Sequence, residues 1–414
     1  MKQSPGALPR RVGVVVAGAG ARGGYEAGVL SVLVPRLRGA GVDTVQFIGT
    51  SAGAINSTIF AALSHLPPAE QAQQALRVWR DITVSDVFRS PTLAFPGTAA
   101  RAAGQLLRIP GVRLTGLLDT GPLHRTAESA VDWIRLRRNI AEGRVTLAVV
   151  TTSGADNRTV VFIDRASAES VPPADDERPI DYVAAEITAE HVLASSAMPI
   201  VFPPVHIHQP DRWEGSYLDG GIRLNTPLKP AITMGADAIA VVATHPAVDT
   251  AATAPANNPP PDVDDVVVRL MDATLVDRMI EDLRTLSKVN ALVGSTARDT
   301  TTEQSRKVVI PFLPITPPAR ATLADLAEEV FASQCHKPRG IAHRLRLTEL
   351  RMLGHALSGD GPRRGDLFSY LYFDPEFIEA SIELGRCHAQ AVFDGLPTNE
   401  VPWQTELLQP LSVS

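Results

Sequence analysis

The clearest chemical motif of the sequence is the run Gly49-Thr50-Ser51-Ala52-Gly53, which has the spacing G-x-S-x-G. In this pattern a serine lies on a sharp, strained turn between a strand and a helix. The small flanking residues let the two backbones approach closely, so that the Ser51 side chain points outward. A serine hydroxyl is a weak nucleophile unless a base and an oxyanion hole lie beside it. The rest of the chain must supply both partners if Ser51 is to attack a carbonyl group.

A second glycine-rich run lies upstream and contains Gly18, Gly20 and Gly23, spaced as G-x-G-x-x-G. By itself this spacing is a weak signal for a Rossmann-type dinucleotide-binding protein. Such a protein also needs an acidic residue at the end of the second strand, to bind the ribose. That position is taken by the Ser51 turn, and Asp43 lies at the wrong end of the strand. We therefore favour a loop whose backbone N–H groups face a developing oxyanion.

The base is the next requirement. A triad hydrolase would supply an acid and then a late histidine, but none of the ten histidines has a loop context that singles it out. His206 and His208 alternate along a predicted strand and share one face, as a metal-binding pair or as ordinary surface residues. Asp219 stands out because Gly220 and Gly221 follow it directly. This tight turn would let a carboxylate approach another backbone, although D-G-G alone is only a turn signal.

Strands and helices alternate around these motifs. Short β-branched runs predict strands at 11–17 and 45–49, and helical spacing predicts helices at 25–38 and from the Ser51 turn to Ala61. This order indicates an α/β fold with a parallel sheet covered by helices. The same patterns predict further strands at 145–152, 159–163, 205–208, 238–243 and 307–315. They predict further helices at 67–81, 122–142, 184–195, 228–234, 266–293, 321–334, 339–357 and 375–394.

Three other segments have a composition typical of loops. Residues 1–10 are expected to be a flexible leader, 170–181 a solvated loop, and 246–265 a Pro-rich loop or linker. Residues 82–121 are apolar but broken by prolines and glycines. They fit either a surface helix pair packed on the core or a mobile cap over acyl chains. Residues 266–414 are expected to form a mostly helical C-terminal region with one strand near 307–315.

The composition is that of an ordinary globular protein, with 44% hydrophobic and 20% charged residues among 414. The net charge of −6 argues against a nucleic-acid partner and provides no polybasic membrane patch. Cys335 and Cys387 are too few for a disulfide framework and are expected to be core residues in a reducing cytoplasm. We find no signal peptide and no run of the ~18 apolar residues that a membrane span requires.

In order and spacing, the glycine loop, the Ser51 turn and the Asp219 turn resemble the patatin-like phospholipase family. The flanking runs 17–30, 194–203 and 219–227 resemble family blocks as well. The resemblance covers about residues 11–245, which it implies are a catalytic domain. It implies a three-layer α/β/α fold with a mainly parallel central sheet, and bacterial members also have long helical C-terminal extensions.

The resemblance also implies a Ser–Asp dyad without histidine, metal or organic cofactor. Ser51 would be the nucleophile and Asp219 the general base. The N–H groups around Ala19 and Gly20 would form the oxyanion hole, with Arg22 beside them. The family loop usually reads Gly-Gly-Gly; Ala19 keeps the N–H donor but would be strained if its φ had to be positive.

An unperturbed aspartate, with a pKa near ~3.9, is a poor base at neutral pH. We therefore expect an apolar, partly desolvated setting that raises the pKa of Asp219. The apolar run 200–204 and Trp213 are candidates for that setting.

The function implied is that of a serine lipid acyl hydrolase, which cleaves carboxylic esters of phospholipids, lysophospholipids or related acyl esters. It would act in the cytoplasm with transient contact to a membrane surface. A non-catalytic lipid-binding member of the same fold is the alternative. Ala19 favours that alternative, whereas the intact Ser51 and Asp219 argue against it.

Overall fold

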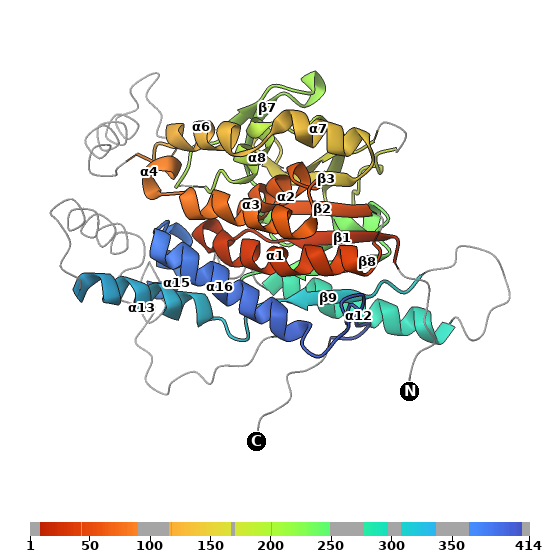
Figure 1. Ribbon diagram of the computed structural model, residues 1–414. Coiled ribbons are helices and arrows are strands. Elements are labelled where there is room, and N and C mark those ends of the chain that lie inside the picture. The colour runs from red at the N-terminus through yellow and green to blue at the C-terminus, as the bar shows by residue number, and fades with distance from the viewer. Residues whose placement is uncertain are drawn as a thin grey trace, which may run out of the picture.

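The computed structural model describes residues 9–42, 44–89, 116, 118–166, 170–199, 201–248, 277–296, 308–336 and 364–407. Within these ranges the chain forms a nine-stranded sheet with the order β5-β4-β3-β2-β1-β8-β9, in which β7 pairs with β3 and β6 with β7 (Figure 1). The strands are β1 (Arg11–Val16), β2 (Thr44–Thr50), β3 (Val145–Ser153), β4 (Thr159–Asp164), β5 (Ile180–Ala184), β6 (Val205–Ile207), β7 (Gly215–Asp219), β8 (Ala238–Val242) and β9 (Phe312–Ile315).

The helices between them are mostly short. They are the 3-10 turn η1 (Gly20–Arg22), α1 (Gly23–Gly39), α2 (Ala52–Ala62), α3 (Pro68–Asp81), α4 (Val84–Val87), α6 (Gly121–Ala130), α7 (Trp133–Ala141), α8 (Ala189–Ser195), η2 (Asp211–Trp213), α9 (Gly221–Leu224), α10 (Leu228–Thr233), α12 (Asp277–Thr296), α13 (Thr322–His336), α15 (Arg364–Leu371) and α16 (Pro375–Val392).

The sheet is mainly parallel, since β3, β2, β1, β8 and β9 all run in one direction. Along the edge opposite β4, strand β3 pairs with two strands in turn. Its first part pairs in parallel with β2 as far as Val150 opposite Thr50. Its last residues pair antiparallel with β7, with Thr151 opposite Asp219. This change of partner brings the end of β7 next to the end of β2, and therefore Asp219 next to the turn at Ser51.

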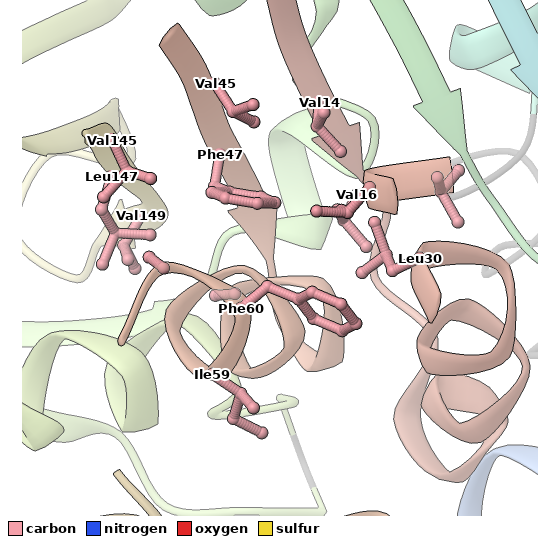
Figure 2. Packing of buried hydrophobic residues seen from close by; sticks show 14 of the residues in the cluster. Val14, Val16, Leu30, Val45, Phe47, Ile59, Phe60, Val145, Leu147 and Val149 are labelled. Carbon is pink, nitrogen blue, oxygen red and sulfur yellow. The ribbon is translucent and has the colours of Figure 1, made fainter. Parts of the chain in front are cut away.

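Apolar side chains alternate between the two faces of the central strands, and helices cover both faces. On one face, Val14, Phe47 and Leu147 pack against α1 and α2 through residues that include Leu30 and Phe60 (Figure 2). The other face packs against α10 and α12. Its core residues include Val15 and Ile48 from the strands, Leu228 from α10 and Leu283 from α12. The predicted α/β fold class, with helices on both sides of the sheet, is confirmed.

The described part of the C-terminal region packs directly onto this framework. Strand β9 pairs with β8 and extends the sheet. Helix α16 lies beside α1 (Figure 1), where the Tyr25 hydroxyl is 3.0 Å from Nδ1 of His388. The two backbones approach so closely that a Cβ atom added at Gly28 would lie 2.2 Å from the Ile382 carbonyl oxygen.

Strand β5 corrects the prediction of a solvated loop at 170–181 and of a helix that starts at Ala184. Residues Ile180–Ala184 pair in parallel with β4, and α8 begins only at Ala189, after the Thr188 capping box. The surrounding Pro- and Asp-rich sequence hides this strand, because strand pairing and not local propensity holds it extended.

Two other predictions are wrong. The helix predicted at 122–142 is split into α6 and α7, because Val131 is extended and the Asp132 carboxylate accepts a hydrogen bond from the Arg135 N–H at 2.9 Å, which starts a new helix. Cys335 and Cys387, expected in the core, are both exposed.

Helix α15 has no counterpart among the predicted helices. Several predicted segments lie wholly or mostly outside the described residues: 1–10, 82–121, 246–265, the first part of 266–293, and 339–357. Among the described residues, no helix combines the length and the apolar character needed to cross a bilayer.

Candidate active site

Ser51 lies at the junction of β2 and α2, with φ 55° and ψ −127°. A positive φ is unfavourable for a residue with a side chain, so the surroundings must hold this turn in place. The close contact between the turn and the neighbouring chain explains the glycines. A Cβ atom at Gly49 would lie 2.3 Å from the Gly53 carbonyl oxygen, and one at Gly53 would lie 2.3 Å from the Ala17 carbonyl oxygen. Thr50 anchors the end of β2, because its hydroxyl donates to the Leu224 carbonyl oxygen at 3.0 Å.

Asp219 ends β7 and is buried, with 5% of its surface exposed. Its Oδ1 accepts a hydrogen bond from the Gly221 N–H at 2.7 Å, and its carboxylate also accepts one from the Ser51 side chain. Burial raises the pKa of Asp219 to about 7, although the bonds from Gly221 and Ser51 lower it in part. A carboxylate in this state can take a proton near neutral pH, as a general base must.

Backbone hydrogen bonds hold the turn at Asp219 in place. The Asp219 N–H donates to the Ala197 carbonyl oxygen at 3.0 Å, and the Gly220 N–H donates to that of Ser195 at 3.4 Å. Of the apolar candidates for the setting of Asp219, Val201 and Phe202 belong to the same cluster as Ala52, the residue after Ser51. Trp213 packs elsewhere, at the edge of the main core cluster.

The glycine loop lies directly against the serine turn, since a Cβ atom at Gly18 would be 3.1 Å from Cβ of Ser51. Ala19 has a φ of −142°, which a residue with a side chain adopts without strain. The positive φ, 55°, falls on Gly20 instead, so the alanine is compatible with the loop.

The backbone N–H groups of the glycine loop are only partly used in hydrogen bonds within the protein. The Gly18 N–H is 3.1 Å from Oδ1 of Asn225, and the Arg22 N–H donates to the Ala19 carbonyl oxygen. Within the described part of the chain, the N–H groups of Ala19 and Gly20 donate to no acceptor. Two such donors beside a serine can bind an oxygen that becomes negatively charged.

Arg22 and Gly23 hold the loop to other elements of the fold. Arg22 is buried and its Nε donates to Oγ of Ser369 on α15 at 2.8 Å. A Cβ atom at Gly23 would lie 2.4 Å from the ring of Trp79 on α3. Both residues therefore hold the loop in position.

Sequence reasoning assigned no role to two side chains that contact the site. The Oγ of Ser195 accepts the Ser51 N–H at 2.9 Å and donates to the Val150 carbonyl oxygen at 2.6 Å. Asn225 holds the Gly18 N–H. Both lie in the sequence runs that flank the motifs, and a signal for them is their polar character inside otherwise small or apolar stretches.

His206 lies on β6 and His208 follows that strand directly, and both are exposed. Nε2 of His206 is 3.3 Å from Glu214, and Nδ1 of His208 is 2.9 Å from Glu190. Among the residues that the structure describes, no three His, Cys, Asp or Glu side chains form a group able to hold a metal ion. These contacts fit the reading of ordinary surface residues better than that of a metal-binding pair.

Comparison with known proteins finds a match between residues 14–232 and the family model described as patatin-like phospholipase. Comparison with curated proteins gives no match. Among solved structures, VipD from Legionella pneumophila is 14% identical with a TM-score of 0.31, covering 90% of this chain and 67% of VipD. A chain of the ExoU–SpcU complex from Pseudomonas aeruginosa is 17% identical with a TM-score of 0.23, covering 94% of this chain and 73% of that chain. The family model matches more than half of the sequence.

Proposed function

Because the chain belongs to the patatin-like phospholipase family, we propose that it hydrolyses carboxylic esters of phospholipids, lysophospholipids or related acyl esters through an acyl-enzyme on Ser51. Membership of the family supports lipid hydrolysis in general; the nucleophile, the base and the substrates are our proposal. The observation that carries it is the hydrogen bond between the strained Ser51 and the buried Asp219, whose pKa is raised to about 7.

In the first half-reaction, Ser51 Oγ attacks the ester carbonyl carbon while Asp219 takes the hydroxyl proton. The carbonyl oxygen becomes an oxyanion that accepts hydrogen bonds from the N–H groups of Ala19 and Gly20. The bond between the carbonyl carbon and the leaving oxygen then breaks, and Asp219 returns the proton to the leaving alcohol. The acyl group remains on Ser51.

In the second half-reaction, Asp219 takes a proton from a water molecule that attacks the acyl-enzyme carbonyl carbon. The same two N–H groups stabilise the second oxyanion, the ester bond to Ser51 breaks, and the proton returns to the serine oxygen. One carboxylate therefore acts as base and acid twice, which works best when its pKa is close to the working pH. The chemistry calls for no metal or organic cofactor.

A serine-reactive fluorophosphonate probe tests the assignment. The wild-type protein should become labelled and Ser51→Ala should not. Ser57→Ala is a matched control, since Ser57 is also buried on α2 but has no part in the proposal. Labelling of Ser51→Ala at the wild-type rate would contradict the proposed nucleophile.

Turnover of a mixed lipid extract, followed by mass spectrometry, would then identify the ester class. The alternative of a non-catalytic lipid-binding protein rests on Ala19, whose backbone is unstrained. Lipid binding without probe labelling or ester turnover would favour that alternative.

A further inference from the structure

The glycine loop is held by a segment that lies outside the family-model match. Helix α15 contributes Ser369, whose Oγ accepts a hydrogen bond from Nε of Arg22 at 2.8 Å, with both side chains fully buried. The next residue, Tyr370, stacks its ring under the Arg22 guanidinium, whose Cζ is 4.3 Å from the ring centroid. Two consecutive residues of α15 therefore contact the Arg22 side chain, one by a hydrogen bond and one by a cation–π contact.

The same segment also touches the loop backbone. A Cβ atom at Gly20 would lie 2.5 Å from the Tyr370 carbonyl oxygen and 3.2 Å from Cδ1 of its ring. Gly20 is the residue with positive φ and one of the two proposed oxyanion donors. Its conformation therefore depends on Tyr370 as well as on its own neighbours in sequence.

Tyr370 is itself fixed from the other side. Its hydroxyl is 2.6 Å from Nε2 of His245, which follows β8 and is buried. Burial, together with the charges of Arg22 and Arg320, lowers the pKa of His245 well below its usual value. The imidazole is thus neutral and can accept the tyrosine O–H, so that Tyr370 is clamped between the end of β8 and the glycine loop.

We propose that Ser369 and Tyr370 are positioning residues for the oxyanion loop, so that ester hydrolysis depends on a C-terminal segment outside residues 14–232. This inference rests on the proposed function. Ser369 fixes the direction of the Arg22 side chain, and Tyr370 fixes both Arg22 and the backbone at Gly20. Loss of the Ser369 bond to Arg22, or of the His245 bond that holds the Tyr370 ring in place, displaces the N–H donors of Ala19 and Gly20 relative to the carbonyl oxygen.

The test compares Ser369→Ala and Tyr370→Phe with Tyr372→Phe. Tyr372 is a matched control because it is buried two residues further on and its hydroxyl donates to Oε1 of Gln334 on α13 at 3.0 Å. Each Tyr→Phe change thus removes one buried hydrogen bond of similar length. Steady-state turnover of an ester should show kcat lowered about tenfold or more for the two loop-facing variants, with little change in KM. The control should stay within twofold of wild type.

Two further readouts separate positioning from general destabilisation. The pH profile of kcat should keep the apparent pKa of wild type in both loop-facing variants, since Asp219 is untouched. Amide hydrogen exchange of a peptide covering residues 18–24 should be faster in Ser369→Ala and unchanged in Tyr372→Phe. This exchange measurement needs no turnover, so it tests the positioning role even if the wild-type protein hydrolyses no ester, an outcome that would contradict only the proposed function. Equal kcat and equal exchange in all three variants would overturn the inference.

Discussion

Strand β2 carries Phe47 in its middle and leads into Ser51 at its carboxyl end, and the two positions are built in opposite ways. Phe47 is buried among valines and packs against Phe60, with ring centroids 6.4 Å apart. Ser51 has a strained backbone and contacts a buried carboxyl group whose pKa is raised to about 7. The packed middle of the strands supplies stability. The carboxyl end of β2 can therefore hold a strained backbone at Ser51 beside a buried carboxyl group. Loss of that carboxyl group should therefore lower kcat without loss of stability, whereas a change at Phe47 should lower stability without loss of kcat.

The largest effect on activity is expected for Asp219→Asn. An amide keeps the size of the side chain but cannot take the Ser51 proton, so kcat should fall by about 10²- to 10⁴-fold. Ester turnover at pH 8 measures this. Asp394→Asn, at an exposed aspartate, is the control and should leave kcat unchanged. A loss of less than threefold in Asp219→Asn would argue that another group is the base.

The same variant should be more stable than the wild-type protein. A folded-state pKa of about 7 lies above the unfolded value of 3.8, so the protonated form of Asp219 favours folding. That contribution is complete below about pH 4 and is lost as the pH rises through 7. By pH 8 the loss amounts to about 4 kcal/mol. Thermal unfolding should therefore show a larger gain in Tm for Asp219→Asn at pH 8 than at pH 5.

In the middle of β2, Phe47→Ala should give the reverse pattern. Removal of a fully buried ring leaves a cavity in the core and should lower the free energy of unfolding by about 3–5 kcal/mol. At a temperature where the variant stays folded, its kcat should match that of the wild-type protein. Ile134→Ala, at a side chain that is 78% exposed, controls for loss of apolar volume without a cavity. A tenfold lower kcat in fully folded Phe47→Ala would show that the core and the site are coupled.

The pH dependence of activity should follow the ionisation of the Asp219 carboxyl group. The base acts only when ionised, so kcat/KM should rise with pH through an apparent pKa of about 7. Between pH 5 and pH 8 the increase should approach about a hundredfold. A profile that is flat over this range would mean that the ionisation of Asp219 does not limit the reaction.

Local pattern was sufficient for much of the fold. The β-branched run at the start of β1 and the helical spacing after Gly23 each depend on neighbouring residues, and both elements appear close to their predicted positions. Strand β5 and helix α15 could not be predicted, because contacts with other elements hold them in place. Strand β5 pairs with β4, and Ser369 on α15 accepts a hydrogen bond from Arg22.

The candidate site divides in a similar way. The spacing around Ser51 predicts a turn at the end of a strand, and the structure has that turn. The meeting of Ser51 and Asp219 depends on β3 changing partners between Val150 and Thr151, which no local pattern indicates. The family resemblance, and not the pattern of residues, related the two residues beforehand. Their chemical roles stay predictions until the variants are measured.

The smallest of these effects, and the most specific test of the turn at Ser51, is expected for Ser195→Ala. This change removes the acceptor of the Ser51 N–H and the donor to Val150, which together hold the strained turn. A buried N–H left without an acceptor should cost about 1–3 kcal/mol of stability, and relaxation of the turn should lower kcat about tenfold.

Ser196→Ala is the matched control for that experiment. Ser196 is the next residue and is also buried, but its hydroxyl donates to the Val192 carbonyl oxygen within α8. Ester turnover measured beside thermal unfolding should separate the two variants: both lose some stability, and only Ser195→Ala loses kcat. Equal losses of kcat would show that α8 as a whole, and not the hydrogen bond to Ser51, maintains the backbone geometry of Ser51.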